Sequence, residues 1–416
     1  MTLAAEPPVP VTRPADGIPE VVRTPAALTA AIDALAAGSG PLGVDTERAH
    51  GFRYWPKAYL IQLRRAGAGT VLIDPVAFEG DADRADFSAA AARLGDVEWI
   101  LHAASQDLPC LAEVQLLPHR LFDTELAGRL LGLPRVSLGA LVEQGLGKSL
   151  AKEHSAADWS RRPLPEAWLS YAALDVELLA DLRDWIAGEV DAAGKTEWAK
   201  QEFAHLVEHA ADQPVPRAEP WRRVSGLHGV RTSRGLAVVR EVWRTRDEIA
   251  QRLDKAPGRI LNDRAIAGLG AAVDAAKTAD IDRPALRRID GFNWRQAARF
   301  ESSWIAALQR VSAMSASDYP ARRAASEDIP HPKGWARNRP EAAARWERVR
   351  PAVNALAEEH TVPPENLLSP DALRRLAWQP PEPLTEESVD AALAAADVRP
   401  WQRELVVPVV TPLLSD

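Results

Sequence analysis

The sequence predicts an α/β domain, with a mixed sheet flanked by helices, followed by all-α helical bundles. Strand and helix patterns alternate through about the first 190 residues, whereas residues 221–311 and 335–414 carry helical patterns only. A chain of 416 residues is also too long for one ordinary hydrophobic core, so two or three domains are expected. Breaks that contain proline, at 212–216 and 312–333, mark the expected linkers.

The α/β domain opens with a helix and a three-stranded meander. Residues 24–38 form the predicted helix, because Thr24 can cap its start and Gly38 can end it. The next strand ends at Asp45 and Glu47. Two further strands are expected at 59–64 and 70–75, and the glycines between them predict a hairpin.

The remainder of this domain alternates between helices and short strands. The expected elements are a helix over 87–94, a strand over 98–102, a strand-to-helix junction at 121–131, a helix within 137–150, a long helix over 165–185 and a further helix after residue 191. At the junction, Asp123 is expected to cap the helix and to have a structural role.

The composition is that of a soluble globular protein, with 46% hydrophobic and 26% charged residues and a net charge of −8. The single cysteine, Cys110, excludes an internal disulfide framework and fits a reducing compartment. Residues 1–19 are rich in Pro and Ala, which predicts a flexible tail and not a signal peptide. Without an apolar run of about 18 residues, no membrane span is expected. A cytoplasmic protein follows from these observations.

Acidic residues at the ends of the predicted strands are the candidate functional groups. Asp45 and Glu47 point from the same face of their strand, because side chains alternate with period two. Such a pair favours a divalent metal ion, and a solvated strand end is the alternative. Asp107 follows the strand over 98–102, and the alternative is that Ser105 or Asp107 is only a helix N-cap. Asp175 lies four residues after Tyr171, so both share one face of the long helix.

Taken together, three stretches resemble the motifs of the DEDD superfamily of 3′→5′ exonucleases, in the branch with Tyr in its third motif, and the ribonuclease D family in particular. The stretches are VDTE at 44–47 with LIQL at 60–63, HAASQDL at 102–108, and WSRRPLP at 159–165 with YAALDV at 171–176. The resemblance covers about residues 20–190 and implies a ribonuclease H-like exonuclease domain over 20–211. One departure is Ala103, where many members have Asn, and it concerns a secondary polar contact, not the metal ligands.

This resemblance implies a role for each acidic residue. Asp45, Glu47, Asp107 and Asp175 would hold two divalent ions, and all-oxygen ligation predicts Mg²⁺ or Mn²⁺. Two such ions can activate the attacking water, stabilise the leaving oxygen and neutralise the phosphate. Tyr171 would position the water or help to deprotonate it. An unperturbed tyrosine, with a pKa of about 10, is a poor base, so orientation is its main expected role.

The second half of the chain is locally basic. Residues 217–260 carry eleven Lys and Arg against five Asp and Glu. The candidate phosphate contacts are Arg240, Arg244 and Lys255 in this region, and His154 and Arg161 in the first domain; solvated surface residues are the alternative. Residues 239–244, 260–263 and 286–292 resemble the HRDC domain, a small helical nucleic-acid-binding bundle. We expect an HRDC domain over 217–311 and a second, HRDC-like helical domain over 330–416.

The resemblance implies a metal-dependent 3′→5′ exoribonuclease with RNA as its partner. It would trim the 3′ ends of structured RNA such as tRNA precursors and release 5′-mononucleotides. A DNA-directed exonuclease on the same fold is the first alternative, since contacts to the 2′-hydroxyl decide between the two substrates. A non-catalytic RNA-binding scaffold is the second, and the complete set of four acids with Tyr171 argues against it. The sequence leaves the oligomeric state open.

Overall fold

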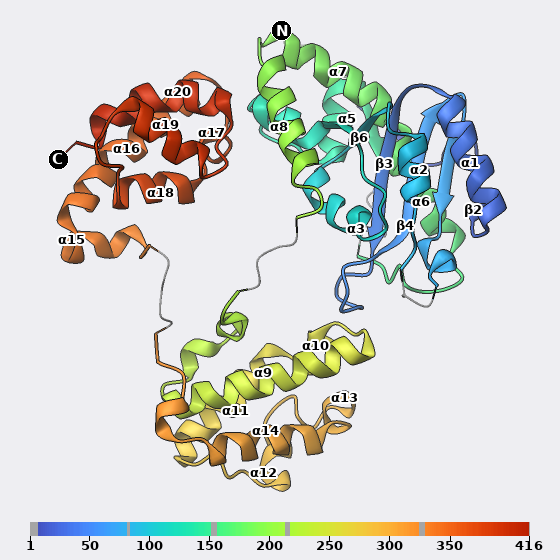
Figure 1. Ribbon diagram of the computed structural model, residues 1–416. Helices are drawn as coiled ribbons and strands as arrows, with labels where there is room; N and C mark the ends of the chain where they lie inside the picture. Colours follow the sequence, from blue (N-terminus) through green and yellow to red (C-terminus); the bar gives the residue numbers. More distant parts are fainter. Residues whose placement is uncertain (1–6, 81–83, 151–155, 213–216, 324–328, 416) are drawn as a thin grey trace.

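The structure is a computed structural model that describes residues 7–80, 84–150, 156–212, 217–323 and 329–415 (Figure 1). Its first part is built on a six-stranded sheet with the order β2–β5–β4–β3–β6–β7. The strands are β2 (Val21–Val22), β3 (Ser39–Arg48), β4 (Ala58–Ala66), β5 (Gly69–Ile73), β6 (Glu98–Leu101) and β7 (Arg120–Asp123). β4 runs antiparallel to β3 and β5, and the other neighbours are parallel. The predicted α/β domain with a mixed sheet is confirmed.

Helices cover both faces of this sheet. α1 (Pro25–Ala37) packs its buried Leu35 into the core that holds Leu42 and Ile61 of one face. Thr24 caps α1 as predicted, since its hydroxyl accepts a hydrogen bond from the Ala27 N–H at 3.3 Å. The remaining helices of this part are α2 (Ser88–Arg93), α3 (Leu108–Glu113), α4 (Thr124–Leu130), α5 (Leu138–Leu146), α6 (Glu166–Glu177), α7 (Leu179–Ala192) and α8 (Thr196–Glu208).

The prediction of one long helix over 165–185 is wrong, because α6 and α7 are separate helices that meet at Leu178. α6 packs against β3, β4 and β5, whereas α7 packs against β3 and β6. Tertiary packing therefore sets the break, which no glycine or proline marks in the sequence. Gly43 permits the close approach, since a Cβ there would lie 3.3 Å from the carbonyl oxygen of Val176.

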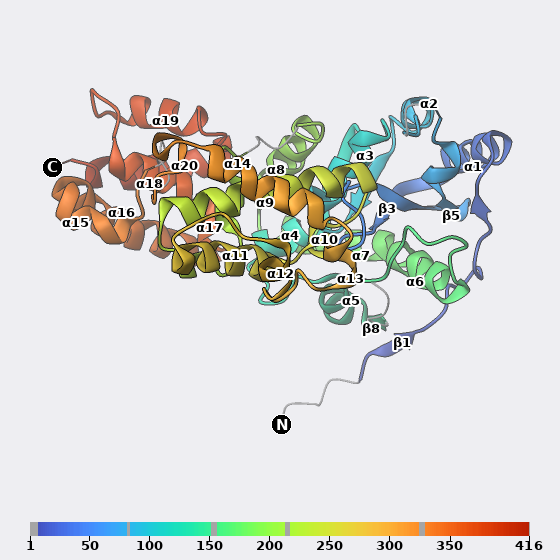
Figure 2. The ribbon, with the colours of Figure 1, turned by 90° about the horizontal axis from the view of Figure 1, so that it is seen from below.

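The N-terminal segment differs from the predicted flexible tail over residues 1–19. Residues 1–6 lie outside the described residues, but β1 (Val9–Val11) pairs in parallel with β8 (Lys148–Leu150). Figure 2 shows this pair apart from the main sheet. The Asp16 carboxylate also lies 2.8 Å from the Arg64 guanidinium on β4. A three-residue strand at 9–11 is too short to give a periodic pattern, so the sequence did not reveal it.

The middle part of the chain is a helical bundle with its own core. Its helices are α9 (Ser233–Leu253), α10 (Pro257–Ile260), α11 (Asp263–Ala276), α12 (Arg283–Arg287), α13 (Arg295–Ala298) and α14 (Glu301–Ala313). Trp221, Val242 and Trp304 are among the side chains buried in that core. Even α9, with 21 residues, is amphipathic, and no helix in the described ranges is long and apolar enough to cross a membrane.

The last part of the chain is also helical, as predicted, but its core is continuous with that of the first part. Its helices are α15 (Trp335–Asn338), α16 (Pro340–Glu359), α17 (Pro364–Leu367), α18 (Pro370–Trp378), α19 (Glu386–Ala394) and α20 (Pro400–Val410). Trp401 stacks on Trp198 of α8 with ring centroids 4.5 Å apart. The Lys195 ammonium donates hydrogen bonds to the carbonyls of Leu130 and His360, both at 2.7 Å.

Glu202 is the polar centre of this junction, and its removal is expected to destabilise the protein. Its buried carboxylate accepts hydrogen bonds from the Trp401 indole N–H at 2.9 Å and from Arg399 at 3.0 Å. Glu202→Ala leaves a partly buried cation and a buried indole N–H unpaired, which costs about 3–5 kcal/mol. Glu197→Ala, on the same helix with both ion-pair partners 68% exposed, should change the unfolding free energy by less than about 0.5 kcal/mol. Denaturant unfolding of both variants measures the difference, and equal stabilities would contradict the role of Glu202.

Candidate active site

The central strand β3 presents two carboxylates on the face covered by α6. Asp45 lies opposite Gln62 of β4, and Glu47 lies opposite Leu60. Leu60 belongs to the apolar cluster that includes Ala172 and the partly buried Tyr171, both on α6. Asp45 and Glu47 therefore point toward the helix that carries the other predicted site residues.

α6 completes the acidic group. One carboxylate oxygen from each of Asp45, Glu47 and Asp175 lies within 4.8 Å of the other two. The Tyr171 side chain hydrogen-bonds to the Asp175 side chain, as the i, i+4 spacing allows. Three of the four predicted metal ligands and the predicted tyrosine are thus brought together.

Asp107 lies beside this group but outside the cluster of three. Its buried carboxylate accepts a hydrogen bond from the Thr46 hydroxyl at 2.6 Å and lies 3.8 Å from the Arg48 guanidinium. Arg48 also donates to the carbonyl of Gln106. Asp107 does occupy the N-cap position of α3, but its side chain makes no capping bond to that helix and instead faces Thr46 and Arg48. The sequence did not reveal the roles of Thr46 and Arg48, because no local pattern links either residue to an acid about 60 residues later.

The carboxylates of this group repel one another, so a bound cation would stabilise their ionised forms. Burial, followed by repulsion from the neighbouring carboxylates, raises the pKa of Asp45 well above its ordinary value and that of Glu47 to about 10. Burial raises the pKa of Asp175 to about 7, against the opposing effect of the Tyr171 hydrogen bond. Burial also raises the pKa of Asp107, although Arg48 and Thr46 oppose the shift. Bound cations would allow these carboxylates to be ionised together at neutral pH.

The chemistry of the residues fits a divalent metal ion. All the donors are carboxylate oxygens, the ligands that hard cations such as Mg²⁺ and Mn²⁺ prefer. Gln62, directly across from Asp45, is fully buried, and its amide has no hydrogen-bond partner within the described part of the chain. Cross-strand neighbours have Cβ atoms about 5 Å apart, so this amide lies next to the acidic group. An orphaned buried amide there is consistent with a bound group that supplies its partner.

Asp123 has the structural role predicted for it. Its buried carboxylate caps α4 by accepting from the N–H groups of Glu125 and Leu126, and it also accepts from those of Ala103 and Ala104. The last two bonds hold Ala103 in the left-handed region, with φ 61°. Asn tolerates that region better than other non-glycine residues. The Asn found at this position in many superfamily members therefore has a backbone explanation.

The loop after β3 is held by the middle bundle. Asp254, at the end of α9, accepts hydrogen bonds from the N–H groups of Tyr54 at 3.1 Å and Trp55 at 3.2 Å. The Ala256 N–H donates to the Phe52 carbonyl at 3.0 Å. This loop leads directly out of the strand that carries Asp45 and Glu47, so the middle bundle contacts the edge of the site.

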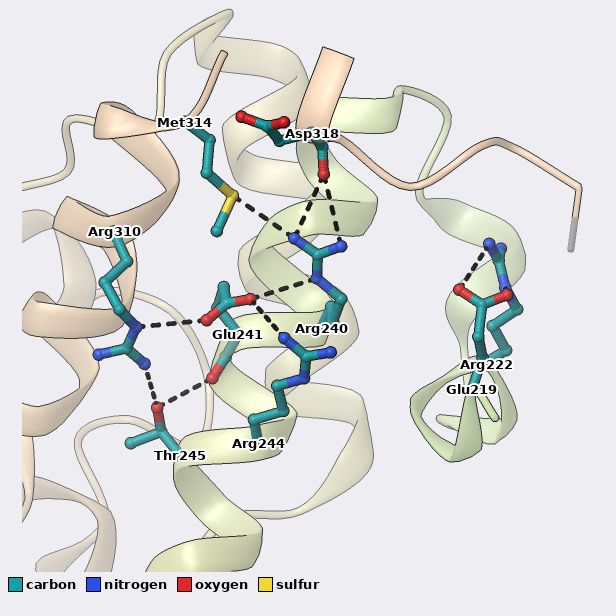
Figure 3. Close-up of polar contacts among 9 residues, drawn as sticks. All are labelled: Glu219, Arg222, Arg240, Glu241, Arg244, Thr245, Arg310, Met314 and Asp318. Carbon is teal, nitrogen blue, oxygen red and sulfur yellow. Dashed lines mark hydrogen bonds and ion pairs between the residues drawn. The ribbon is translucent and has the colours of Figure 1, made fainter. Parts of the chain in front are cut away.

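The predicted phosphate contacts have different surroundings. His154 lies outside the described residues. Arg161 and Lys255 are exposed, and no hydrogen bond or ion pair joins their side chains to other residues of the described ranges. Arg240 and Arg244 both contact the Glu241 carboxylate (Figure 3).

Comparison with known proteins agrees with this geometry. A family model described as "3'-5' exonuclease" matches residues 19–191, and one described as "3' to 5' exonuclease C-terminal domain" matches residues 328–414. The curated Ribonuclease D of Gluconacetobacter diazotrophicus is 31% identical over 345 residues, which cover 82% of this chain and 81% of that protein. The curated Ribonuclease D of Acidiphilium cryptum is 32% identical over 285 residues, or 68% of this chain and 69% of that protein.

Solved structures resemble the chain over nearly its whole length. A crystal structure of a protein from Bifidobacterium adolescentis has a TM-score of 0.86 at 36% identity and covers 98% of this chain and 99% of its own. The structure of Escherichia coli RNase D, described as an exoribonuclease involved in structured RNA processing, has a TM-score of 0.65 at 22% identity, covering 95% and 98%. At that identity the second likeness concerns the fold alone.

Proposed function

The chain belongs to the ribonuclease D family of 3′→5′ exoribonucleases, and from this premise we propose that it trims the 3′ ends of structured RNA, tRNA precursors among them. One observation carries the proposal: oxygens of Asp45, Glu47 and Asp175 meet within 4.8 Å beside Tyr171. An RNA-binding scaffold would have no use for a partly buried group of carboxylates that repel one another. Hydrolysis would release 5′-mononucleotides.

We propose that the metal site is formed by four acids: Asp45, Glu47, Asp107 and Asp175. They would hold two divalent ions, Mg²⁺ or Mn²⁺, through their carboxylate oxygens. When bound, such ions neutralise charge on the phosphate and lower the pKa of water. Asp107 would enter the set while the Thr46 hydroxyl and Arg48 fix its carboxylate.

Tyr171 would orient the attacking water. Burial and the nearby carboxylates raise its pKa above the ordinary value, so the hydroxyl keeps its proton at neutral pH. A protonated hydroxyl that donates to Asp175 retains lone pairs that can accept a hydrogen bond from water. This favours orientation over proton abstraction as the role of Tyr171.

The helical parts would bind the RNA that extends away from the site. We propose that residues 217–311 act as an HRDC domain and residues 330–416 as a second, HRDC-like domain, both following the exonuclease domain at 20–211. The basic excess in 217–260 and the contact between Asp254 and the loop after β3 support this for the first of them. Its contribution to affinity should decrease steeply with salt.

The test is a digestion of RNA and DNA of the same sequence, each labelled at the 5′ end, with Mg²⁺, Mn²⁺ or EDTA. We expect progressive shortening of the RNA from its 3′ end, loss of activity in EDTA, and slower cleavage of DNA. Preferred cleavage of DNA would favour the DNA-directed alternative. RNA binding without cleavage under any metal condition would favour the scaffold alternative.

A further inference from the structure

Three arginines converge on one buried carboxylate in the middle bundle (Figure 3). Glu241 of α9, whose side chain is only 7% exposed, contacts Arg240, Arg244 and Arg310, each at 3.2 Å. Arg310 comes from α14, so the cluster joins two helices. Arg310 lies outside residues 217–260, so it is not one of the eleven basic residues counted in that region.

The three guanidiniums differ in how many N–H groups remain available. Arg240 is 17% exposed and directs its two terminal nitrogens to the carbonyl of Asp318, so its role is structural. Arg244 and Arg310 are 55% and 47% exposed. Arg310 gives one terminal nitrogen to the Thr245 hydroxyl at 2.7 Å. Among the described residues, the other terminal nitrogen of Arg310 and two nitrogens of Arg244 have no hydrogen-bond acceptor.

The cluster carries excess positive charge in a fixed geometry. One carboxylate faces three guanidiniums, and the Asp318 carboxylate is engaged by Ser315 instead. Glu248 lies one turn after Arg244 on α9, but no ion pair joins the two in the described chain. Because Glu241 holds both exposed arginines in place, less side-chain entropy would be lost when they bind an anion. Paired guanidinium N–H groups match the oxygens of a phosphate.

Helix α9 connects this cluster to the edge of the active site. Ten residues separate Arg244 from Asp254, a helical rise of roughly 15 Å. Asp254 is the residue that accepts from the backbone of Tyr54 and Trp55, in the loop after β3. An RNA strand that leaves Asp45 past the loop after β3 and continues along α9 would bring its upstream phosphates to Arg244.

We propose that Arg244 and Arg310 form a phosphate-binding site, positioned by Glu241, for the RNA backbone upstream of the 3′ end being cut. The inference rests on the proposed function for the identity of the strand. It assigns the contact to two particular arginines and not to the general charge of the bundle.

The test compares two matched double variants in the full-length protein. In Arg244→Gln/Arg310→Gln both proposed contacts are lost. The control is Arg283→Gln/Arg287→Gln, on the same bundle. Its two arginines are 55% and 63% exposed and also share one buried glutamate, Glu301. Equilibrium binding of a single-stranded RNA of roughly 12 nucleotides, in EDTA, is measured against salt.

We expect the first variant to bind about tenfold more weakly, and its salt slope to fall by about 0.7 for the one phosphate released. The second variant should stay within about twofold of the parent, a difference of roughly 0.4 kcal/mol. Arg244→Lys/Arg310→Lys keeps the charge but not the planar fork, so it should restore the salt slope and only part of the affinity. Cleavage of a dinucleotide, which is too short to reach the site, should be unchanged in all variants.

If the two glutamine variants lose RNA affinity equally, the general positive charge of the bundle binds the RNA and the proposal is wrong. An affinity of Arg244→Gln/Arg310→Gln within twofold of the parent, with an unchanged salt slope, would also overturn the proposal. A reduced rate of cleavage of the dinucleotide would overturn it as well. Because binding in EDTA needs no catalysis, failure of this site is distinguishable from failure of the proposed nuclease function.

Discussion

Asp45→Asn is expected to abolish RNA hydrolysis while the protein stays folded. Asp45 contributes an oxygen to the cluster of three carboxylates and is repelled by both Asp107 and Asp175. An amide keeps the shape of the side chain but removes the charge that would hold the cations. Loss of several kcal/mol of transition-state stabilisation corresponds to a decrease in rate of at least about 10³-fold. Single-turnover cleavage of RNA with saturating Mn²⁺ measures it.

A second measurement on the same variant does not depend on activity. Mn²⁺ should raise the melting temperature of the parent protein, because a ligand that binds only the folded state stabilises it. Asp45→Asn should lose most of this rise. Without metal, the variant should be at least as stable as the parent, since the substitution removes one of several mutually repelling charges. Asp33→Asn, an exposed carboxylate on α1, is the matched control and should retain both the activity and the metal response. A folded Asp45→Asn variant with near-normal turnover would exclude the metal-holding role.

Those parts of the fold that follow from local periodicity could be predicted from the sequence. The alternation along β3 placed Asp45 and Glu47 on one face, and the i, i+4 spacing on α6 placed Tyr171 beside Asp175. Both patterns depend only on the geometry of a single element. The hairpin between β4 and β5 was predictable for the same reason, because glycines separate two apolar runs.

Contacts between distant segments could not be predicted in this way. The Thr46 hydroxyl bonds to an aspartate 61 residues away, and Arg310 joins a cluster on a helix some 70 residues earlier. The hydrophobic core shared by the first and last parts of the chain is another contact that the sequence does not predict. The linker predicted at 212–216 implies that residues 217–416 could be deleted without loss of the active site. Because Trp401 stacks on Trp198 and Asp254 holds the loop after β3, that deletion should instead destabilise the nuclease part. Point variants in the full chain therefore test the helical half more cleanly.

Tyr171→Phe is expected to decrease the rate of hydrolysis by roughly 10²–10⁴-fold while the affinity for metal stays close to that of the parent. The ring packs among apolar side chains that include Ala172, and Phe preserves this packing. What is lost is the hydroxyl that hydrogen-bonds to Asp175 and would orient the water. Single-turnover kinetics with a Mn²⁺ titration separates a change in rate from a change in metal affinity.

Tyr59→Phe provides the matched control for this last prediction. Tyr59 lies on β4 in the same apolar cluster and is 5% exposed. The charged residues near its hydroxyl do not belong to the acidic group; they are Asp254, Arg53, Glu79 and Asp158. Its substitution should leave the rate within about twofold of the parent, or roughly 0.4 kcal/mol by transition-state arithmetic. If Tyr171→Phe also stays within that limit, Tyr171 is only a packing residue and the four carboxylates alone constitute the site. If its rate decreases but the Mn²⁺ midpoint shifts by the same factor, Tyr171 acts through the position of Asp175 and not on the water.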